Sequence, residues 1–294
     1  MTVARRPRRI GILGHAGRPG VRRAAARLYA QLKRAGHRPI IDARLAAELE
    51  VPGEPLNRMV RSCDVLVTLG GDGTVLAGAR AAAGTRCVLL PVNMGGLGFL
   101  TIAESRELSA SLQHALKGHW PIVQRRMVSA IVRRRGRTLL RGVALNDAVV
   151  KSAGGHSAVH LRLSALGDDL GHLVADGIVV ASAAGSTAYA LSAGGPVLAP
   201  DVEAVVVAPV CPHTIGSRPL VLAPGSEVGI TVIGSFERIT LLLDGQERSD
   251  LSPRDEVRVR LDRARVRLFQ NPARPFGLTL RRKLGWQGSA TRSF

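Results

Sequence analysis

The sequence is poor in aromatic residues and cysteines and has no long apolar run. Phe, Trp and Tyr make up 3% of its 294 residues, so a core must be built mainly from aliphatic side chains. The three cysteines, Cys63, Cys87 and Cys211, are odd in number and have no metal-ligand spacing. Each lies in or beside an apolar run, which predicts buried thiols in a reducing cytoplasm. No apolar stretch reaches the ~20 residues that span a bilayer, so no membrane segment is expected.

Acidic residues and lysine are also scarce. The chain has 22 Asp and Glu residues but 41 basic residues, of which only 4 are Lys. Its formal net charge is +19. Such an excess suits nucleic acid, an anionic membrane surface or an anionic small molecule. The arginines are spread along the whole chain and do not alternate with aromatic residues. This favours a solvated basic surface over a dedicated nucleic-acid surface, and nucleotide substrates are compatible with the charge.

The first third of the chain alternates apolar strand patterns with helix patterns. Leu28 and Leu32 lie four residues apart in one helix pattern, which Gly36 ends. Strands that are apolar throughout and joined by helices indicate a parallel sheet covered on both faces. The strand patterns fall at 9–13, 39–42, 65–69 and 86–92, and the helix patterns at 21–35, 74–83 and 104–117.

Beyond Trp120 and Pro121 the apolar residues alternate with polar ones. Val257, Val259 and Leu261, for example, are separated by arginines. A period of two, with Gly and Pro turns between the segments, predicts antiparallel sheets in a sandwich. The expected fold class is an α/β N-terminal domain with a parallel sheet plus an all-β sandwich C-terminal domain. The expected domains are 1–121 and 122–270, followed by a tail at 271–294.

A glycine-rich turn, Gly70-Gly71-Asp72-Gly73-Thr74, joins the strand pattern at 65–69 to the next helix pattern. Glycines allow close backbone approach, and backbone N–H groups at a helix N-terminus bind phosphate. The spacing matches neither of the two common nucleotide loops. Asp72 would repel phosphate unless it serves a metal ion or an acceptor hydroxyl. Alternatively, Asp72 caps the helix after an ordinary tight turn.

Four further segments combine polar residues and glycines after apolar runs. The hydroxyl groups and glycines of the stretch 185–196 suit a polar ligand that needs backbone contacts. The segment Asp244-Gly245-Gln246 is by itself typical of a hairpin turn. The segments are the loop 93–100, the pair Asn146-Asp147, the pair Asp176-Gly177 with the stretch 185–196, and Asp244-Gly245-Gln246.

In this order, the motifs resemble the NAD kinase family. The Gly-Gly-Asp-Gly-Thr turn is shared with diacylglycerol kinases and, more loosely, with phosphofructokinases. The block Gly-Ser-Thr-Ala-Tyr…Ser-Ala-Gly-Gly-Pro at 185–196 is specific to NAD kinases. Segments 212–220 and 283–286 also resemble the family, so the resemblance covers about 10–286. It implies an α/β domain, a β-sandwich domain, a tail that returns to the first domain, and a homodimer or homotetramer.

The resemblance implies that NAD is phosphorylated on its adenosine ribose 2′-hydroxyl to give NADP, in the cytoplasm. ATP or another polyphosphate would be the donor, with Mg²⁺ or another divalent ion as cofactor and no dedicated protein metal site. Asp72 would accept the hydroxyl proton, and Tyr189 would line the base pocket. The implied donor turn is Gly70, Gly71, Gly73 and Thr74. The implied substrate contacts are Asp72, Gly73, Asn146, Asp147, Asp176, Thr187, Ala188, Tyr189, Ser192 and Gln246.

The sequence departs from the family pattern at three places. Ser182-Ala183-Ala184 stand where Thr-Pro-Thr is usual, so one ligand hydrogen bond is missing or is made by water. Asp147 stands where Glu is commoner. Val174 replaces a basic residue found in many relatives that favour oxidised NAD, which predicts relaxed discrimination against NADH. Equal turnover of both forms would support this hypothesis, and brisk NAD turnover without NADH turnover would contradict it.

Two alternatives stay open at this point. One is a lipid or sugar kinase that shares the glycine-rich turn. The other is a nucleotide- or nucleic-acid-binding relative that has lost catalysis, motivated by the charge of +19 and by Ala184.

Overall fold

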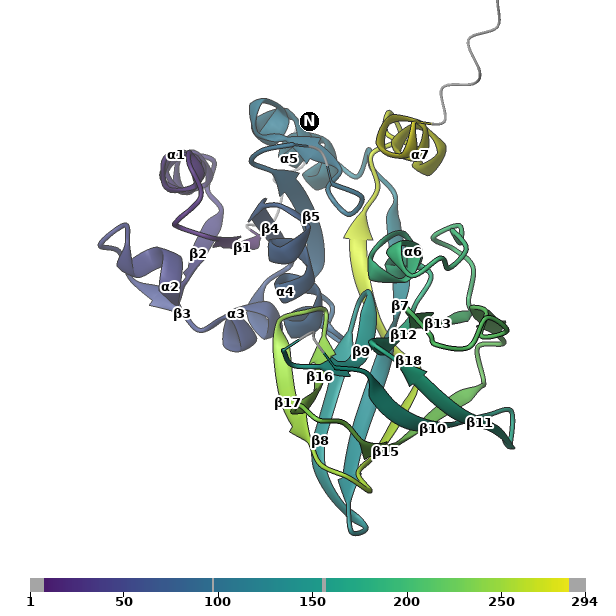
Figure 1. Cartoon of the computed structure of the whole chain (residues 1–294). Coiled ribbons are helices and arrows are strands. Elements are labelled where there is room, and N and C mark those ends of the chain that lie inside the picture. Colours follow the sequence, from purple (N-terminus) through teal and green to yellow (C-terminus); the bar gives the residue numbers. More distant parts are fainter. Residues whose placement is uncertain (1–7, 97, 155–156, 286–294) are drawn as a thin grey trace, which may run out of the picture. The chain divides into compact units, whose positions relative to one another are not determined.

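Figure 1 shows the computed structural model of the chain, which describes residues 8–96, 98–154 and 157–285. Leu97 of the predicted loop and Trp286 of the predicted tail lie outside the described residues. The chain divides into two compact units, Met1–Gln124 with Arg267–Phe294 and Arg125–Val266. Within the part that the structure describes, no helix has both the length and the apolar character needed to cross a bilayer.

The first unit is built on a parallel sheet. Its strands are β1 (Arg9–Gly14), β2 (Arg38–Asp42), β3 (Gly53–Glu54), β4 (Val65–Gly70), β5 (Val88–Asn93), β6 (Ala103–Glu104) and the end of β18 (Glu256–Phe269). The order is β3-β2-β1-β4-β5, and both β6 and the last residues of β18 pair with β5. Every residue of β4 and β5 is buried, as expected for strands covered on both faces.

Helices cover this sheet. Helix α1 buries Val21, Ala25, Leu28 and Leu32, so its apolar residues recur at about one turn's spacing and face the core. The helices are α1 (Val21–Arg34), α2 (Ala43–Ala47), α3 (Leu56–Ser62), α4 (Asp72–Ala82), the 3₁₀ turn η1 (Ser105–Glu107), α5 (Leu108–Leu116) and α7 (Phe276–Leu284).

The expected helix at 104–117 is wrong at its start. Glu104 is extended and ends β6, and it forms a capping box with Glu107 around η1. Helix α5 therefore begins only at Leu108. The capping box satisfies backbone N–H groups that a longer helix would have used in its own ladder.

The second unit is all β apart from two short helical turns. Its elements are β7 (Ile122–Arg134), β8 (Arg137–Ala144), β9 (Asp147–Ser152), β10 (Val159–Ala165), β11 (Asp168–Ala175), β12 (Gly177–Ala181), η2 (Ala184–Thr187), α6 (Tyr189–Ser192), β13 (Val205–Val210), β14 (Leu220–Leu222), β15 (Glu227–Gly234), β16 (Ile239–Leu243), β17 (Glu247–Leu251) and most of β18. One sheet runs β11-β10-β15-β18 with β7 and β8 attached, and the other runs β14-β13-β12-β9-β16-β17.

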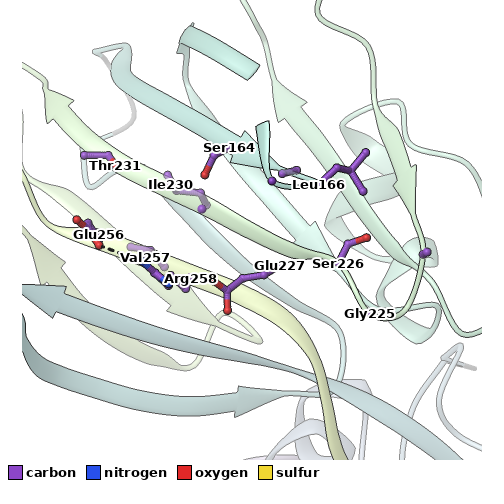
Figure 2. A pocket seen from close by; sticks show the side chains of 14 residues that line it. Ser164, Leu166, Gly225, Ser226, Glu227, Ile230, Thr231, Glu256, Val257 and Arg258 are labelled. Atoms are coloured by element: carbon purple, nitrogen blue, oxygen red, sulfur yellow. Dashed lines mark hydrogen bonds and ion pairs between the residues drawn. The ribbon is translucent and has the colours of Figure 1, made fainter. Parts of the chain in front are cut away.

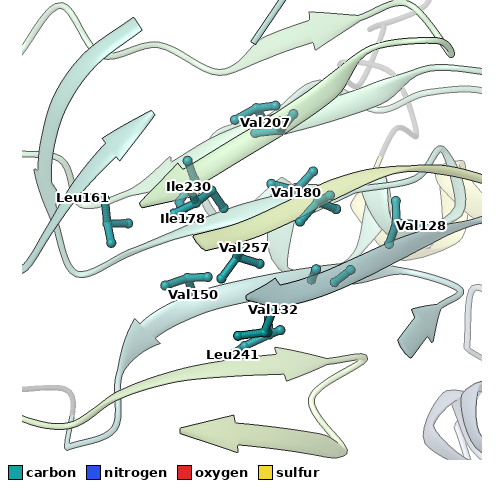
Figure 3. Packing of buried hydrophobic residues seen from close by; sticks show 14 of the residues in the cluster. Val128, Val132, Val150, Leu161, Ile178, Val180, Val207, Ile230, Leu241 and Val257 are labelled. Atoms are coloured by element: carbon teal, nitrogen blue, oxygen red, sulfur yellow. The ribbon is translucent and has the colours of Figure 1, made fainter. Parts of the chain in front are cut away.

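The core of the second unit lies between these two sheets. Val128, Ile178, Leu241 and Val257 come from strands of both sheets and are among the residues of one buried cluster (Figure 3). Along β18, Val257, Val259 and Leu261 are buried and the arginines between them are exposed. The predicted fold class, an α/β unit with a parallel sheet plus a β-sandwich, is therefore confirmed.

Candidate active site

The glycine-rich turn lies at the carboxyl end of β4. Gly71 is the N-cap of α4, has an extended conformation and offers no side chain to cap the helix. Asp72 is the first residue of α4. The helix thus begins two residues earlier than the sequence pattern predicts, and the N–H groups of Thr74 and Val75 donate to the Gly71 carbonyl at 3.0 and 3.3 Å.

The side chain of Asp72 is held by a distant loop rather than by its own helix. Its Oδ2 accepts a hydrogen bond of 3.0 Å from the backbone N–H of Phe99, and its Oδ1 accepts one of 3.1 Å from that of Leu100. Two amides therefore fix the carboxylate orientation, and each oxygen keeps a free lone-pair direction. Asp72 therefore does not cap the helix, which was the alternative interpretation of this turn.

The loop that holds Asp72 is itself well braced. The Asn93 side chain donates to the Gly96 carbonyl at 2.5 Å and accepts from the Gly95 N–H at 2.8 Å. Thr101 Oγ1 accepts from the N–H of Gly98 at 3.1 Å. A Cβ on Gly98 would overlap the Asp72 carboxylate, so only glycine allows this approach.

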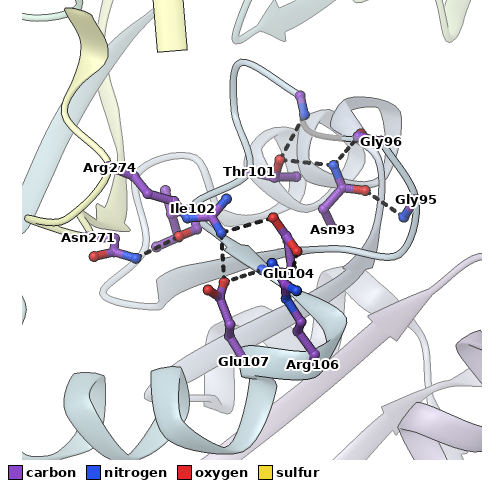
Figure 4. A network of polar contacts seen from close by, with 11 residues as sticks. Asn93, Gly95, Gly96, Thr101, Ile102, Glu104, Arg106, Glu107, Asn271 and Arg274 are labelled. Atoms are coloured by element: carbon purple, nitrogen blue, oxygen red, sulfur yellow. Dashed lines mark hydrogen bonds and ion pairs between the residues drawn. The ribbon is translucent and has the colours of Figure 1, made fainter. Parts of the chain in front are cut away.

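Residues near the C-terminal end of the chain brace the base of this loop (Figure 4). Asn271 donates to the Ile102 carbonyl at 3.0 Å, and Arg274 donates to Glu104 at 3.1 Å and to Glu107 at 2.8 Å. The hydrogen bond from the Glu104 N–H, together with Arg274, lowers the pKa of Glu107.

Arg18 lies against the glycine-rich turn. Its guanidinium nitrogens are 3.1 and 3.2 Å from the point that a Cβ on Gly71 would occupy, and one is 4.0 Å from the corresponding point on Gly95. Among the described residues this exposed guanidinium has no hydrogen-bond or ion-pair partner. Our sequence reasoning missed Arg18. The signal was a Gly-Arg-Pro-Gly segment after the first strand.

In the second unit, the polar corner Leu145-Asn146-Asp147 lies where β9 begins. The Asp244 carboxylate accepts backbone hydrogen bonds from all three residues, at 3.0, 2.7 and 3.4 Å. Ser182 Oγ donates to the Leu145 carbonyl at 2.5 Å and accepts from the Gly185 N–H at 3.3 Å. The hydroxyl at Ser182 therefore serves the corner itself.

Asp147 is a buried carboxyl beside a second carboxyl. Only 5% of its surface is exposed. Burial, and then the charge of Asp244, raise the pKa of Asp147 from 3.8 to about 7. Its ionised form is thus costly in the folded chain, because the two carboxylates repel each other in a poorly solvated place.

This raised pKa predicts a pH dependence of stability. Between 3.8 and about 7 the folded chain binds the Asp147 proton more tightly than the unfolded chain, so the contribution of Asp147 to stability falls as pH rises. We expect Asp147→Asn to gain stability relative to wild type between pH 4 and 8, measured by thermal unfolding. Asp168→Asn, which changes an exposed carboxylate, should show no such trend. A constant difference between wild type and Asp147→Asn across this range would contradict the prediction.

The other predicted substrate contacts of the second unit lie on its turns. Thr187 donates to Ala184 O at 3.2 Å, Ala188 precedes α6, and Tyr189 and Ser192 are the ends of α6. Asp176 is exposed between β11 and β12, and Gln246 is exposed in the β16–β17 turn. That turn has Asp244 and Gly245 at positive φ, as the hairpin interpretation predicts.

Four groups of the second unit, Tyr189, Cys211, Asp176 and Asp147, are close enough to influence one another. Burial raises the pKa of Tyr189, and the charges of Cys211, Asp176 and Asp147 raise it further. A hydrogen bond with Asp176 raises the pKa of Cys211. Cys63 and Cys87 are buried as expected, but the expectation for Cys211 is wrong, since it is exposed at positive φ beside Asp176.

A pocket of about 730 Å³ also lies in the second unit, on strands β10, β15 and β18 (Figure 2). Ser164, Leu166, Ser226, Glu256 and Arg258 are among the residues that line it. None of the residues that line it is a predicted site residue.

Comparison with known proteins bears on what these two polar sites do. The ATP-NAD kinase N-terminal domain model matches residues 10–120, and the ATP-NAD kinase C-terminal domain model matches 145–270. The chain belongs to the ATP-NAD kinase family. An NAD kinase of Desulforamulus reducens is 39% identical over 76% of this chain and 78% of its own length.

Two solved structures have the same fold as this chain. Yeast NADH kinase, in complex with NADH, superposes with a TM-score of 0.89 at 24% identity, covering 99% of this chain and 91% of the yeast chain. An NAD kinase from Archaeoglobus fulgidus, in complex with ATP, has a TM-score of 0.75 at 23% identity and covers 92% and 97%. At these identities the likeness concerns the fold.

Proposed function

We propose that this chain phosphorylates NAD on the adenosine ribose 2′-hydroxyl, with ATP or another polyphosphate as donor and Asp72 as general base. The observation that carries the proposal is the Asp72 carboxylate, oriented by two loop amides at the N-terminus of α4. A fixed carboxylate with free lone pairs can accept a hydroxyl proton as the phosphoryl group arrives. Membership of the ATP-NAD kinase family and NAD kinases such as that of D. reducens support NAD as the acceptor.

The acceptor nucleotide would be bound by the corner at Asn146 and Asp147 and by the turns that carry Asp176, Tyr189 and Gln246. Asn146 Oδ1 is buried and, among the described residues, has no hydrogen-bond partner, so a ligand donor would satisfy it. Ionised Asp147 can accept hydrogen bonds from ribose hydroxyls. Thr187, Ala188 and Ser192 would add contacts along the same turns. The NADH complex of the yeast relative supports a nicotinamide dinucleotide here.

The donor phosphates would be bound at Gly70, Gly71, Gly73 and Thr74. The amides at the start of α4 favour anions, and the ATP complex of the A. fulgidus relative supports a nucleotide donor. Among the described residues no group of three or more His, Cys, Asp or Glu side chains could hold a metal ion. Mg²⁺ would be bound mainly by phosphate oxygens and water, where it would neutralise phosphate charge.

Arg18 would contact the donor phosphates from the other side of the turn. Its guanidinium already lies against Gly71, and without a protein partner it can pair with a phosphate oxygen. We expect Arg18→Ala to raise the KM for ATP about 10- to 100-fold, the value of a charge-assisted hydrogen bond, and to leave the KM for NAD unchanged. Steady-state kinetics with each substrate varied would check this.

Arg27→Ala is the matched control for Arg18, because it removes an exposed arginine from the following helix and should leave both constants unchanged. Partial rescue of Arg18→Ala by millimolar guanidinium would indicate a role for the guanidinium group itself. Equal effects of the two substitutions on the KM for ATP would overturn the assignment of Arg18.

Several further features belong to the same proposal. The change of pattern near Trp120 and Pro121 supports domains 1–121 and 122–270 with the tail 271–294, and the resemblance supports a homodimer or homotetramer. Cysteine usage supports a cytoplasmic location, and the departure from the family pattern at Val174 supports a relaxed choice between NAD and NADH. The half-buried side chain of Val174 lies on β11, and its carbonyl accepts from the N–H of His213 at 2.9 Å. The apolar side chain there offers no charge that would distinguish the two redox forms of the nicotinamide.

A panel of acceptors tests the proposed function against its alternatives. The purified chain is incubated with γ-labelled ATP, Mg²⁺ and either NAD, diacylglycerol or a hexose. We expect label only in NADP, because the C-terminal model of the ATP-NAD kinase family matches 145–270, whereas the glycine-rich turn is shared more widely. Label in the lipid or sugar would favour the alternative kinase, and NAD binding without transfer would favour a non-catalytic relative.

A further inference from the structure

We propose that Asp244 is a positioning residue for the acceptor nucleotide, which acts by holding the Leu145-Asn146-Asp147 corner so that the Asn146 side chain meets the ligand. The inference rests on the proposed function and deepens it. It concerns a residue that makes its contacts through backbone amides and that sequence reasoning treated only as part of a hairpin turn.

The Asp244 carboxylate binds the backbone of this corner. Asp244 is 7% exposed, and its carboxylate accepts from the backbone N–H groups of Leu145, Asn146 and Asp147. Its own N–H donates to the Asp147 carbonyl at 3.0 Å. Its φ is 52°, a left-handed conformation in which Asp is better tolerated than most side chains. Four hydrogen bonds thus join the β16–β17 turn to the three residues of the corner.

A second element holds the same corner from another direction. The Ser182 N–H donates to the Asn146 carbonyl at 2.8 Å, and Ser182 Oγ donates to the Leu145 carbonyl at 2.5 Å. Gly185 packs directly on the Asn146 peptide, where a Cβ would overlap the carbonyl. Both peptide groups of Asn146 are therefore bound, and its backbone cannot rotate without breaking several buried hydrogen bonds.

The fixed backbone of Asn146 holds its side chain in one place. Asn146 is 8% exposed, and within the described chain its Oδ1 has no hydrogen-bond partner. A buried carbonyl oxygen without a partner is unfavourable unless a ligand donates to it. The chemistry that fits is an amino or hydroxyl donor of the nucleotide. The clamp keeps this acceptor in place before the ligand arrives, which reduces the ordering cost of binding.

Asp244 also lies close to Asp147, and its charge affects the pKa of that carboxyl. A residue with a merely structural role would have no such effect. Two acidic groups, Asp147 and Asp244, share one buried corner, and Tyr189 lies within electrostatic reach of Asp147. Removing the charge at 244 leaves burial as the cause of the raised pKa of Asp147 and lowers that pKa. The pH at which Asp147 loses its proton therefore reports on the contact.

The test uses the full chain and the variants Asp244→Asn, Asn146→Ala and their combination. Asp244→Asn keeps the size but places an amide against backbone N–H groups. We expect it to weaken NAD binding, measured by calorimetry, about 10- to 100-fold. The KM for ATP should not change. The pH below which NAD affinity falls (the acid limb of its pH profile) should move to a lower value. Because Asp244 acts through Asn146, the double variant should lose little more than Asn146→Ala alone.

Asp250→Asn is the matched control, since it changes an exposed carboxylate on the same hairpin and should bind NAD as the wild type does. If Asp244→Asn does not fold, Asp244→Glu keeps the charge and misplaces it, and should weaken NAD binding without moving the acid limb. Wild-type affinity in the folded variants, or additive losses in the double variant, would overturn the role of Asp244. A wild-type chain that neither binds NAD nor forms NADP would instead overturn the proposed function.

Discussion

Gly98→Ala should lower kcat for NADP formation about 100-fold, the loss expected when a reacting group is misplaced by about 1 Å. The added Cβ would overlap the Asp72 carboxylate, so either the carboxylate or the loop that carries Phe99 and Leu100 must move. Either movement breaks the two hydrogen bonds that orient Asp72. Steady-state kinetics with saturating NAD and ATP would measure the loss.

Gly96→Ala is a matched control two residues away in the same loop. A Cβ on Gly96 would have no atom within 4 Å, and its φ is not in the left-handed region. We expect kcat within about 2-fold of wild type, since neither space nor backbone opposes the change. Equal losses in the two variants would show that any stiffening of the loop matters, and would contradict a specific contact between Gly98 and Asp72.

Asp72→Asn should reduce kcat by at least ~100-fold, the lower end for a lost general base. The amide has nearly the size of the carboxylate but cannot accept a proton from the ribose hydroxyl. It also has one acceptor oxygen for two loop amides, so either the Phe99 or the Leu100 N–H would face its NH₂ group. The loop should therefore loosen, which adds to the chemical loss. Single-turnover measurements would separate the chemical step from product release.

Asp64→Asn is the control for this substitution, because it changes an exposed carboxylate of the same unit that accepts from the Arg9 N–H at 2.8 Å. We expect a small loss of stability and unchanged kcat. Full activity of Asp72→Asn would remove Asp72 from the mechanism.

The local patterns of the sequence predicted the framework of the site. The apolar run at 65–69 and the glycines after it indicated a strand, a turn and a helix, because these signals depend on neighbouring residues. The alternation at 257–261 indicated a sandwich strand for the same reason. The start of α5 was wrong because a capping box at Glu104 and Glu107 competes with the helix.

The contacts that orient the candidate groups could not be predicted in this way. Asp72 meets Phe99 and Leu100 across 27 and 28 residues, and Asp244 meets Leu145 across 99 residues. Such pairs depend on how strands are ordered in a sheet, which periodicity does not specify. Arg18 was missed for the same reason, and the exposure of Cys211 depends on a turn at positive φ.

The most direct test of the central claim is identification of the product that the wild-type chain makes from NAD, ATP and Mg²⁺. The product is measured with a dehydrogenase that accepts only NADP, and phosphorus NMR places the new phosphate on the ribose. We expect NADP with the phosphate on the adenosine 2′-oxygen, formed in amounts equal to the ADP released. ATP hydrolysis without NADP, or phosphate on another oxygen, would contradict it.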